Sequence, residues 1–483
     1  MDWTAAHPTS VSFPLRGCVR FLPWICGMVF LVAATGCAHY PINQPLKQSD
    51  PQGGYRAKNF KHMGTNNDML VMLTFSGGGT RAAAFSYGVL EALRDTEISI
   101  HGSKKRMLDE VDFISGVSGG SFTAAYYGLF GDRIFEDFES RFLKKNIQGE
   151  LIRGTLFNPV NWAKFASPYY GRSDLAADYY DKYVFDHGTF GDILAHGGPM
   201  VVINATDMTL GTRFSFIQDP FDAICSDLCS FSVARACAAS SAVPVLLSPV
   251  TLRNYAGTCG YQLPPALAEA MQPPRDVTSR RFDLANNMLP FLDSQKKPYF
   301  HLVDGGVADN LGLRAVLERV TLMGDPWTTL KYANLTNVHK IVFVVVNAET
   351  EIDTKWDRFE TNPPFGVKLA SYSSIAIARY NTDTMALLSE SFHRWADEIR
   401  KGRCGSSKIT TEPGSCGDME FYLVEVKFDA LDDEAERHYF KQLPTSFVLQ
   451  PEEVDKLRDA ARRILTKSKE FQRLVNDLQD NHL

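Results

Sequence analysis

The chain has 483 residues, of which 45% are hydrophobic and 22% charged, which is the composition of a folded globular protein with one large core or two domains. Its formal net charge is −6, and no long acidic or basic block occurs. The sequence therefore lacks the basic footprint of a nucleic-acid-binding protein, and we expect no nucleic-acid partner.

The N-terminal segment has the pattern of a targeting signal. Arginines precede an uncharged apolar run over residues 21–35, which is typical of a secretory signal and short for a membrane span. Small residues stand directly before Cys37, and this order resembles the processing site of bacterial lipoproteins, in which Cys37 carries the lipid. We therefore expect residues 1–36 to be a signal peptide and the protein to be a lipoprotein of the bacterial cell envelope. Because Ala38 rather than aspartate follows Cys37, the outer membrane is favoured. The alternative is an uncleaved anchor in the inner membrane with a periplasmic body.

The segment after the signal divides into a linker and an α/β unit. Residues 37–67 are polar and proline-containing and lack periodicity, so they are predicted to be a tether. From residue 68 to 348 apolar runs alternate with helical patterns, which favours a three-layer α/β/α fold with a mostly parallel central sheet. The expected strands are 70–75, 111–114, 200–204, 301–303 and 340–346, and the expected helices are 81–94, 121–130, 231–241 and 311–322.

Two further regions have a different character. A proline-rich stretch at about 262–297 is predicted to be a surface insertion in the α/β unit. Residues 349–483 are predicted to be a helix-rich C-terminal extension that packs on the catalytic domain, with a helix over 371–390 and a strand over 421–426. From about Pro451 a final amphipathic helix carries apolar residues at spacings of three to four, so one face is expected to pack on the core.

Six cysteines follow Cys37, an even number that suits an oxidising compartment. Cys404 and Cys416 flank a glycine- and serine-containing loop that a disulfide could close. Cys225 and Cys229 have a spacing that a zinc site could use, but no second Cys or His pair lies close by. We therefore expect disulfides or buried thiols and no metal site.

Three consecutive glycines, Gly77, Gly78 and Gly79, separate an expected strand from an expected helix. With Ala82 they also meet a loose dinucleotide-binding pattern, so their amides could bind either a phosphate or the oxyanion of an acyl-transfer reaction. A dinucleotide fold would end its second strand in an acidic residue. The next expected strand instead runs into glycines around Ser118, which favours the oxyanion.

Ser118 is the candidate nucleophile. It stands in the order Gly-Val-Ser-Gly-Gly between an expected strand and an expected helix, which is the pattern of a nucleophile elbow. The alternative is an ordinary glycine turn with a serine that caps the helix. Because a serine nucleophile needs donors for the oxyanion, a second glycine turn on the neighbouring strand makes the elbow the better interpretation.

Asp304 is the candidate base. It precedes Gly305 and Gly306 at the end of the expected strand 301–303, and in an open parallel sheet the carboxyl ends of the strands gather at the ligand site. A histidine is the alternative base. His301 lies three positions from Asp304, which on a strand turns it to the opposite face, whereas His187 and His196 stand beside glycines in loop-like sequence and stay open as alternatives.

Taken together, the stretch from Ser76 to Arg81, the elbow around Ser118 and the Asp-Gly-Gly of Asp304 resemble the three motifs of patatin-like phospholipases, as does the stretch 238–244 between the second and third. The resemblance covers residues 69–347 and implies a Ser118–Asp304 dyad, with the amides of Gly77, Gly78 and Gly79 as the oxyanion hole. It also implies a phospholipid or other acyl-ester substrate at a membrane. No cofactor is expected, because the sequence contains no EF-hand loop or zinc signature. Arg81 is expected to support the glycine loop or to help neutralise charge, and a surface salt bridge is the alternative.

The expected function is that of a serine lipid acyl hydrolase similar to phospholipase A or lysophospholipase. Two alternatives stay open from the sequence. One is an acyltransferase or thioesterase that uses the same dyad, because the motifs specify the acyl-enzyme but not its acceptor. The other is a catalytically silent, lipid-binding envelope lipoprotein.

Overall fold

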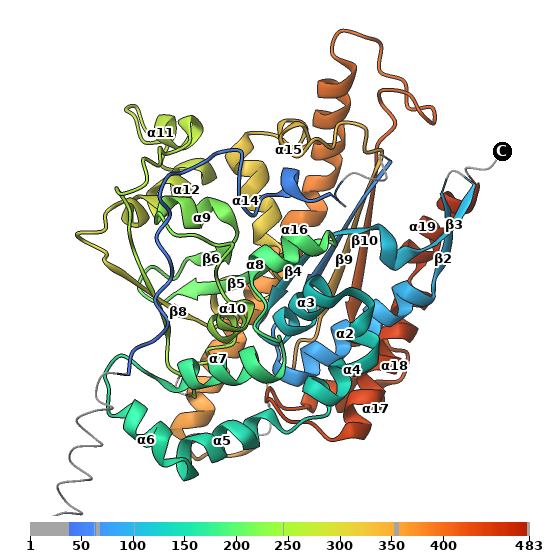
Figure 1. Ribbon diagram of the computed structural model, residues 1–483. Coiled ribbons are helices and arrows are strands. Elements are labelled where there is room, and N and C mark those ends of the chain that lie inside the picture. Colours follow the sequence, from blue (N-terminus) through green and yellow to red (C-terminus); the bar gives the residue numbers. More distant parts are fainter. Residues whose placement is uncertain are drawn as a thin grey trace, which may run out of the picture.

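The computed structural model describes residues 38–480 except 62, 64–67, 101, 245 and 352–356 (Figure 1). The predicted signal peptide and the predicted lipidation of Cys37 lie outside the described residues. Among the helices that are described, none is long and apolar enough to cross a membrane.

An eight-stranded mixed sheet forms the centre of the protein, in the order β10-β9-β1-β4-β5-β8-β7, with β6 also paired to β5. The four neighbouring pairs from β10 to β5 are parallel, and the pairs that β5 makes with β6 and β8, and β8 with β7, are antiparallel. The predicted mostly parallel sheet is therefore confirmed. The strands are β1 (Met69–Phe75), β4 (Val111–Val117), β5 (Met200–Asp207), β6 (Arg213–Phe216), β7 (Val250–Arg253), β8 (Tyr299–Val303), β9 (Lys340–Asn347) and β10 (Glu420–Lys427).

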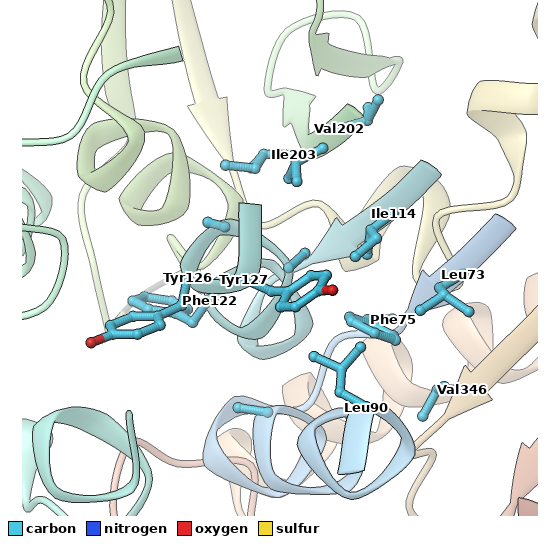
Figure 2. Packing of buried hydrophobic residues seen from close by; sticks show 14 of the residues in the cluster. Leu73, Phe75, Leu90, Ile114, Phe122, Tyr126, Tyr127, Val202, Ile203 and Val346 are labelled. Atoms are coloured by element: carbon cyan, nitrogen blue, oxygen red, sulfur yellow. The ribbon is translucent and has the colours of Figure 1, made fainter. Parts of the chain in front are cut away.

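Strand β1 shows why the sheet is covered on both faces. All seven of its residues are buried, as expected for a central parallel strand. Because side chains alternate along a strand, Leu73 and Phe75 join one apolar cluster and Leu70 and Met72 join another. Figure 2 shows Leu73 and Phe75 packed on the first of these faces, next to Leu90. The three-layer α/β/α arrangement is thus confirmed.

Helices from distant parts of the chain form the two outer layers. The face of Leu73 is covered by α2 (Gly79–Asp95), α3 (Gly119–Phe130) and α18 (Pro451–Lys467), and the opposite face by α14 (Arg314–Met323) and α16 (Phe365–Cys404). The remaining helices are α4 (Ile134–Phe138), α5 (Ile147–Phe157), α6 (Pro159–Phe165), α7 (Arg172–Tyr183), α8 (Phe190–His196), α9 (Gln218–Ala223), α10 (Val233–Ser240), α11 (Pro265–Ala270), α12 (Arg280–Met288), α13 (Gly306–Asp309), α15 (Pro326–Tyr332), α17 (Glu434–Gln442) and α19 (Lys469–Asp480), and a small hairpin joins β2 (Glu97–Ile100) to β3 (Ser103–Arg106).

The C-terminal region is part of the same body. Strand β10 extends the central sheet by pairing with β9, and α18 lies along α2. On α18, Val454, Leu457, Ala461 and Leu465 are buried, so the predicted packing of one face on the core is confirmed. The proline-rich stretch at 262–297 contains α11 and α12.

Two disulfides connect four of the six described cysteines, and Cys229 and Cys237 are free thiols. Cys404 pairs with Cys416, as predicted. Cys225 pairs with Cys259, at a sequence separation of 34, so the spacing from Cys225 to Cys229 reflects neither a zinc site nor a local bridge. Within the described part of the chain, no group of three or more His, Cys, Asp or Glu side chains could hold a metal ion.

Candidate active site

Ser118 lies at the sharp turn between β4 and α3. Its backbone has φ +47° and ψ −121°, a strained conformation for a residue with a side chain and one typical of a nucleophile elbow. The turn has no room for larger neighbours, because a Cβ on Gly119 would lie 1.9 Å from the Gly79 carbonyl oxygen. The backbone N–H of Ser118 donates to Ser240 Oγ at 2.8 Å, which fixes the turn from the side of α10.

Asp304 is hydrogen-bonded to this serine. Ser118 Oγ donates to Asp304 Oδ2 at 2.9 Å, and the Gly306 N–H donates to Asp304 Oδ1 at 2.8 Å. The sequence thus predicted correctly that the two side chains lie together. That they act as a catalytic dyad stays a prediction.

The path by which Asp304 reaches the site differs from the expected one. Strand β8 does not run parallel to its neighbour: it pairs antiparallel with the end of β5, with Thr206 opposite Val303. The overlap is only two residues long, so Asp304 leaves β8 beside the last part of β5. The neighbouring strand β4 pairs its Val117 with Asn204 of β5, which places Ser118 at the same level. The chain therefore enters the site at Asp304 along a strand that runs opposite to β4 and β5.

Burial raises the pKa of the Asp304 carboxyl toward the range in which a general base works. Only 4% of the surface of Ser118 and 9% of that of Asp304 is exposed. Burial, opposed by the hydrogen bonds from Gly306 and Ser118, raises the pKa of Asp304 from 3.8 to about 6. At pH 7 most of the carboxylate is still ionised, and its proton affinity is far higher than that of an exposed aspartate.

A ring of backbone and hydroxyl contacts holds the pair in place. The Asp304 N–H donates to the Ala242 carbonyl at 3.0 Å, and Thr206 Oγ1 donates to the Asp304 carbonyl at 2.8 Å. Ser240 Oγ, which accepts from the Ser118 N–H, donates in turn to the Asn204 carbonyl at 2.5 Å. Sequence reasoning noted the stretch 238–244 without giving it a role. The structure shows that it is the support between nucleophile and base.

The three glycines are not equivalent. The Gly77 N–H donates to the Asn310 carbonyl at 3.1 Å, so it is committed to the backbone. The N–H groups of Gly78 and Gly79 donate to no described acceptor, and both residues have positive φ, at +141° and +60°. Of the three amides expected to bind the oxyanion, those of Gly78 and Gly79 thus have no described acceptor in the structure. The Gly119 N–H, in the first turn of α3 directly after Ser118, is the position at which a nucleophile elbow supplies a further donor.

Arg81 supports this loop. Its guanidinium is fully buried and donates to the carbonyls of Ala348 at 3.0 Å and Leu443 at 2.6 Å and to Thr445 Oγ1 at 3.1 Å. Burial lowers the pKa of Arg81 to about 10. Its hydrogen bonds within the described residues go to carbonyls and a hydroxyl and to no carboxylate, so a surface salt bridge is the wrong alternative. Arg81 thus ties the loop that precedes α18 to the start of α2.

The same contact continues through backbone atoms. The Thr80 N–H donates to the Ser446 carbonyl at 2.9 Å, and a Cβ on Gly79 would lie 2.4 Å from that oxygen. The C-terminal region therefore packs directly against the glycine loop, a contact that no motif in the sequence indicated.

None of the three histidines is hydrogen-bonded to Ser118 or Asp304. His301 Nδ1 lies 3.2 Å from Thr251 Oγ1 on β7, and burial lowers the pKa of His301. His187 pairs with Asp181 on the surface, and His196 lies on α8 beside Gly131. The aspartate is therefore the basic group in contact with the serine.

A cavity of about 960 Å³ lies at the carboxyl ends of β9 and β10. Its lining is mainly polar and begins at Asn347, the last residue of β9. The next residue, Ala348, donates its N–H to Ser76 Oγ at 2.9 Å, directly before the glycine loop. The cavity thus borders the loop without including Ser118 or Asp304 in its lining.

A comparison with models of protein families agrees with the motifs. The sequence model of one family, described as "Patatin-like phospholipase", matches residues 73–317, just over half of the chain and the part that holds the site. No curated protein sequence matches the chain.

Among solved structures, human GIVD cytosolic phospholipase A2 is similar at 12% identity and a TM-score of 0.35. The alignment covers 95% of this chain and 64% of that chain. The same human enzyme in complex with methyl gamma-linolenyl fluorophosphonate is similar at 11% identity and a TM-score of 0.34, with the same coverage. The chain thus spans slightly less than two thirds of their length.

Proposed function

Because the chain belongs to the patatin-like phospholipase family, we propose that it is a serine lipid acyl hydrolase that cleaves fatty-acyl esters of phospholipids or lysophospholipids. The observation that carries this proposal is the 2.9 Å hydrogen bond from Ser118 Oγ to Asp304 Oδ2, together with the raised pKa of that carboxyl. A serine hydroxyl is a weak nucleophile until a neighbouring base takes its proton, and Asp304 is the base in reach.

The reaction follows from the contacts. Ser118 Oγ attacks the ester carbonyl carbon while Asp304 takes the hydroxyl proton. The oxyanion that forms accepts hydrogen bonds from the amides of Gly78 and Gly79 and from the first turn of α3. When the intermediate collapses, the proton on Asp304 goes to the departing alcohol of the glycerolipid, and the acyl group stays on Ser118. Asp304 then takes a proton from water, which attacks the acyl-enzyme. As the bond between the acyl group and Ser118 Oγ breaks, Asp304 returns this proton to Ser118 Oγ, so the fatty acid is released and the free serine is restored.

We further propose that the protein works at a membrane of the bacterial cell envelope, held there by lipid on Cys37 or by an uncleaved N-terminal anchor. The support is the apolar run 21–35 followed by small residues and Cys37. A tether of this kind would keep the dyad close to phospholipid, its proposed substrate.

Product analysis tests the proposed activity. The full chain is incubated with phospholipid vesicles in water enriched in ¹⁸O, and the products are identified by mass spectrometry. We expect free fatty acid with one ¹⁸O atom and an equal amount of lysophospholipid, and loss of both with Ser118→Ala or Asp304→Asn. Fatty-acid release that persists with Ser118→Ala would overturn the proposal. Transfer of the acyl group to an added alcohol in place of water would assign the dyad to an acyltransferase.

A further inference from the structure

Large apolar side chains are exposed together on two consecutive helices, α5 and α6. Phe157 and Val160 are 76% and 63% exposed, and Ile152, Leu156 and Trp162 are each about half exposed. Asn158 joins the helices and caps α6 by accepting from the Val160 N–H at 3.0 Å, so the exposed Leu156, Phe157 and Val160 follow one another closely around this junction. We call these five residues the α5–α6 face. A cluster of this kind on a folded protein marks a surface that binds something apolar.

The indole nitrogen of Trp162, the one polar side-chain atom among the five residues of the α5–α6 face, already has a hydrogen-bond partner. Trp162 Nε1 donates to the Thr155 carbonyl at 3.0 Å, within the same pair of helices. The indole therefore offers its apolar body to the outside and needs no polar partner there. Aromatic and aliphatic side chains on helices that lie flat on the surface are typical of segments that enter the boundary between lipid headgroups and acyl chains.

The beginning of the described chain is attached beside this face. The Tyr40 N–H donates to the Tyr169 carbonyl at 3.0 Å, the His39 ring stacks on the Tyr169 ring at 5.0 Å, and Ser167 Oγ donates to the Ala38 carbonyl. Residues 167–169 follow directly after α6. Cys37 directly precedes Ala38, and the apolar run 21–35 ends three residues before Ala38. Three residues of extended chain span about 11 Å at most, so the end of this run lies within that distance of Ala38. A bilayer that holds either the run or a lipid on Cys37 therefore lies next to the face.

The face is also connected to the candidate active site. At the start of α5 the Gln148 N–H donates to the Phe447 carbonyl at 3.2 Å. The preceding residue, Ser446, accepts from the Thr80 N–H at 2.9 Å next to Gly79. One short loop therefore links α5 to the glycine loop. Figure 1 shows α5 and α6 at the lower edge of the molecule, far from α11 and α12.

From these observations we propose that the α5–α6 face docks on the phospholipid bilayer that holds the N-terminus and orients the Ser118–Asp304 site toward that bilayer. The orientation toward substrate rests on the proposed hydrolase activity, and the docking rests on the proposed membrane tether but not on that activity. The face would let acyl esters leave the bilayer close to the glycine loop without crossing open water.

A pair of double variants tests the proposal in the full chain, reconstituted in vesicles of phosphatidylethanolamine and phosphatidylglycerol. Phe157→Ser with Val160→Ser removes the centre of the face. Val277→Ser with Leu289→Ser is the matched control, because both residues are exposed and apolar but lie near α11 and α12. Turnover of vesicle phospholipid is divided by turnover of a water-soluble short-chain ester, which reports the fold and the dyad.

We expect the first double variant to lower this ratio at least tenfold and the control to leave it within twofold of the wild type. An unchanged ratio in the first variant, or an equal fall in the control, would overturn the proposal. A fall in the ratio that coincides with a change from dimer to monomer would also overturn it, because the face would then join two copies of the chain.

A second measurement does not depend on turnover. Lipids with brominated acyl chains quench tryptophans that enter the apolar layer, and the difference between the wild type and Trp162→Phe isolates the signal of Trp162. We expect this difference signal to be quenched, and no quenching would refute docking. If the wild type cleaves neither ester nor phospholipid but Trp162 is quenched, the proposed function fails and the docking face stands.

Discussion

Replacing Asp304 by asparagine tests two effects of this carboxylate separately. One is how much its charge destabilises the fold, and the other is its role as the candidate base. Asparagine has the same shape, its oxygen can still accept from the Gly306 N–H, and its nitrogen can donate to Ser118 Oγ. The substitution therefore removes the negative charge and leaves the contacts intact. We expect the variant to be inactive and more stable than the wild type at neutral and alkaline pH.

The size of the effect follows from the pKa of Asp304, which burial raises from 3.8 to about 6. The folded protein then holds this proton more tightly than the unfolded chain does, so the stability from the neutral carboxyl is full below about pH 4 and is lost as the pH rises through 6. This linkage gives a cost of about 3 kcal/mol at pH 8 and about 1 kcal/mol at pH 4.5. Asp304→Asn should therefore raise the free energy of unfolding by these amounts at the two pH values.

Chemical denaturation of the full chain in detergent, followed by tryptophan fluorescence at several pH values, measures this difference between wild type and variant. Burial also raises the pKa of Asp309 to about 6, but that carboxyl is present in both proteins, so its contribution cancels in the difference. In the same pH range, kcat/KM of the wild type for a soluble ester should fall tenfold per pH unit below about 6. Equal stability of the two proteins at pH 8, or a gain that does not change with pH, would refute the reasoning.

Three further predictions concern the surroundings of the dyad. Arg81→Met should lower the free energy of unfolding by about 2 to 4 kcal/mol, measured by denaturant titration, because it leaves two buried carbonyls and a hydroxyl without their donor; a change below 1 kcal/mol would contradict the supporting role. Gly119→Ala should reduce kcat at least a hundredfold, because the new Cβ would lie 1.9 Å from the Gly79 carbonyl oxygen and must displace the glycine loop; an active variant would show that the loop is not the oxyanion site. His301→Ala should keep most of the ester-hydrolysis rate, because the ring contacts β7 rather than Asp304, and a large loss would favour a histidine-dependent mechanism.

The sequence predicted the site better than it predicted the path of the chain around it. Ser118 and the glycine loop each follow an apolar strand and open a helix, and both patterns are local, so they can be recognised without the fold. The pairing of β8 is not local. The short strand pattern at 301–303 before Asp304 carries no information about direction, and the antiparallel pairing with β5 depends on contacts about a hundred residues away. Asp304 was placed correctly because a short antiparallel overlap brings it to the same edge.

Other features were beyond local patterns for the same reason. Cys225 has Cys229 nearby in sequence, yet its partner is Cys259, because the fold brings the loop after β7 against the end of α9. Which amides of the glycine loop are free depends on Asn310, which occupies that of Gly77. A spacing argument cannot see such a contact, and only the assembled site shows it.

The aromatic residues after the elbow helix illustrate a further limit. These residues stand close together in the sequence. The structure divides them: Tyr180 is fully buried, Phe130 and Phe135 pack partly buried against the core, and Tyr169 is exposed beside the first described residues. Composition could not separate these positions, because burial depends on which helix covers each side chain.

The most direct test of the dyad is the covalent labelling of the full chain by a fluorophosphonate that carries a fatty-acyl chain, followed by mass spectrometry of the intact protein and of its peptides. With a Ser118–Asp304 dyad we expect one adduct per chain, located on Ser118, no adduct with Ser118→Ala, and labelling at least a hundredfold slower with Asp304→Asn. An adduct on another residue, or labelling of Ser118→Ala at the wild-type rate, would contradict it.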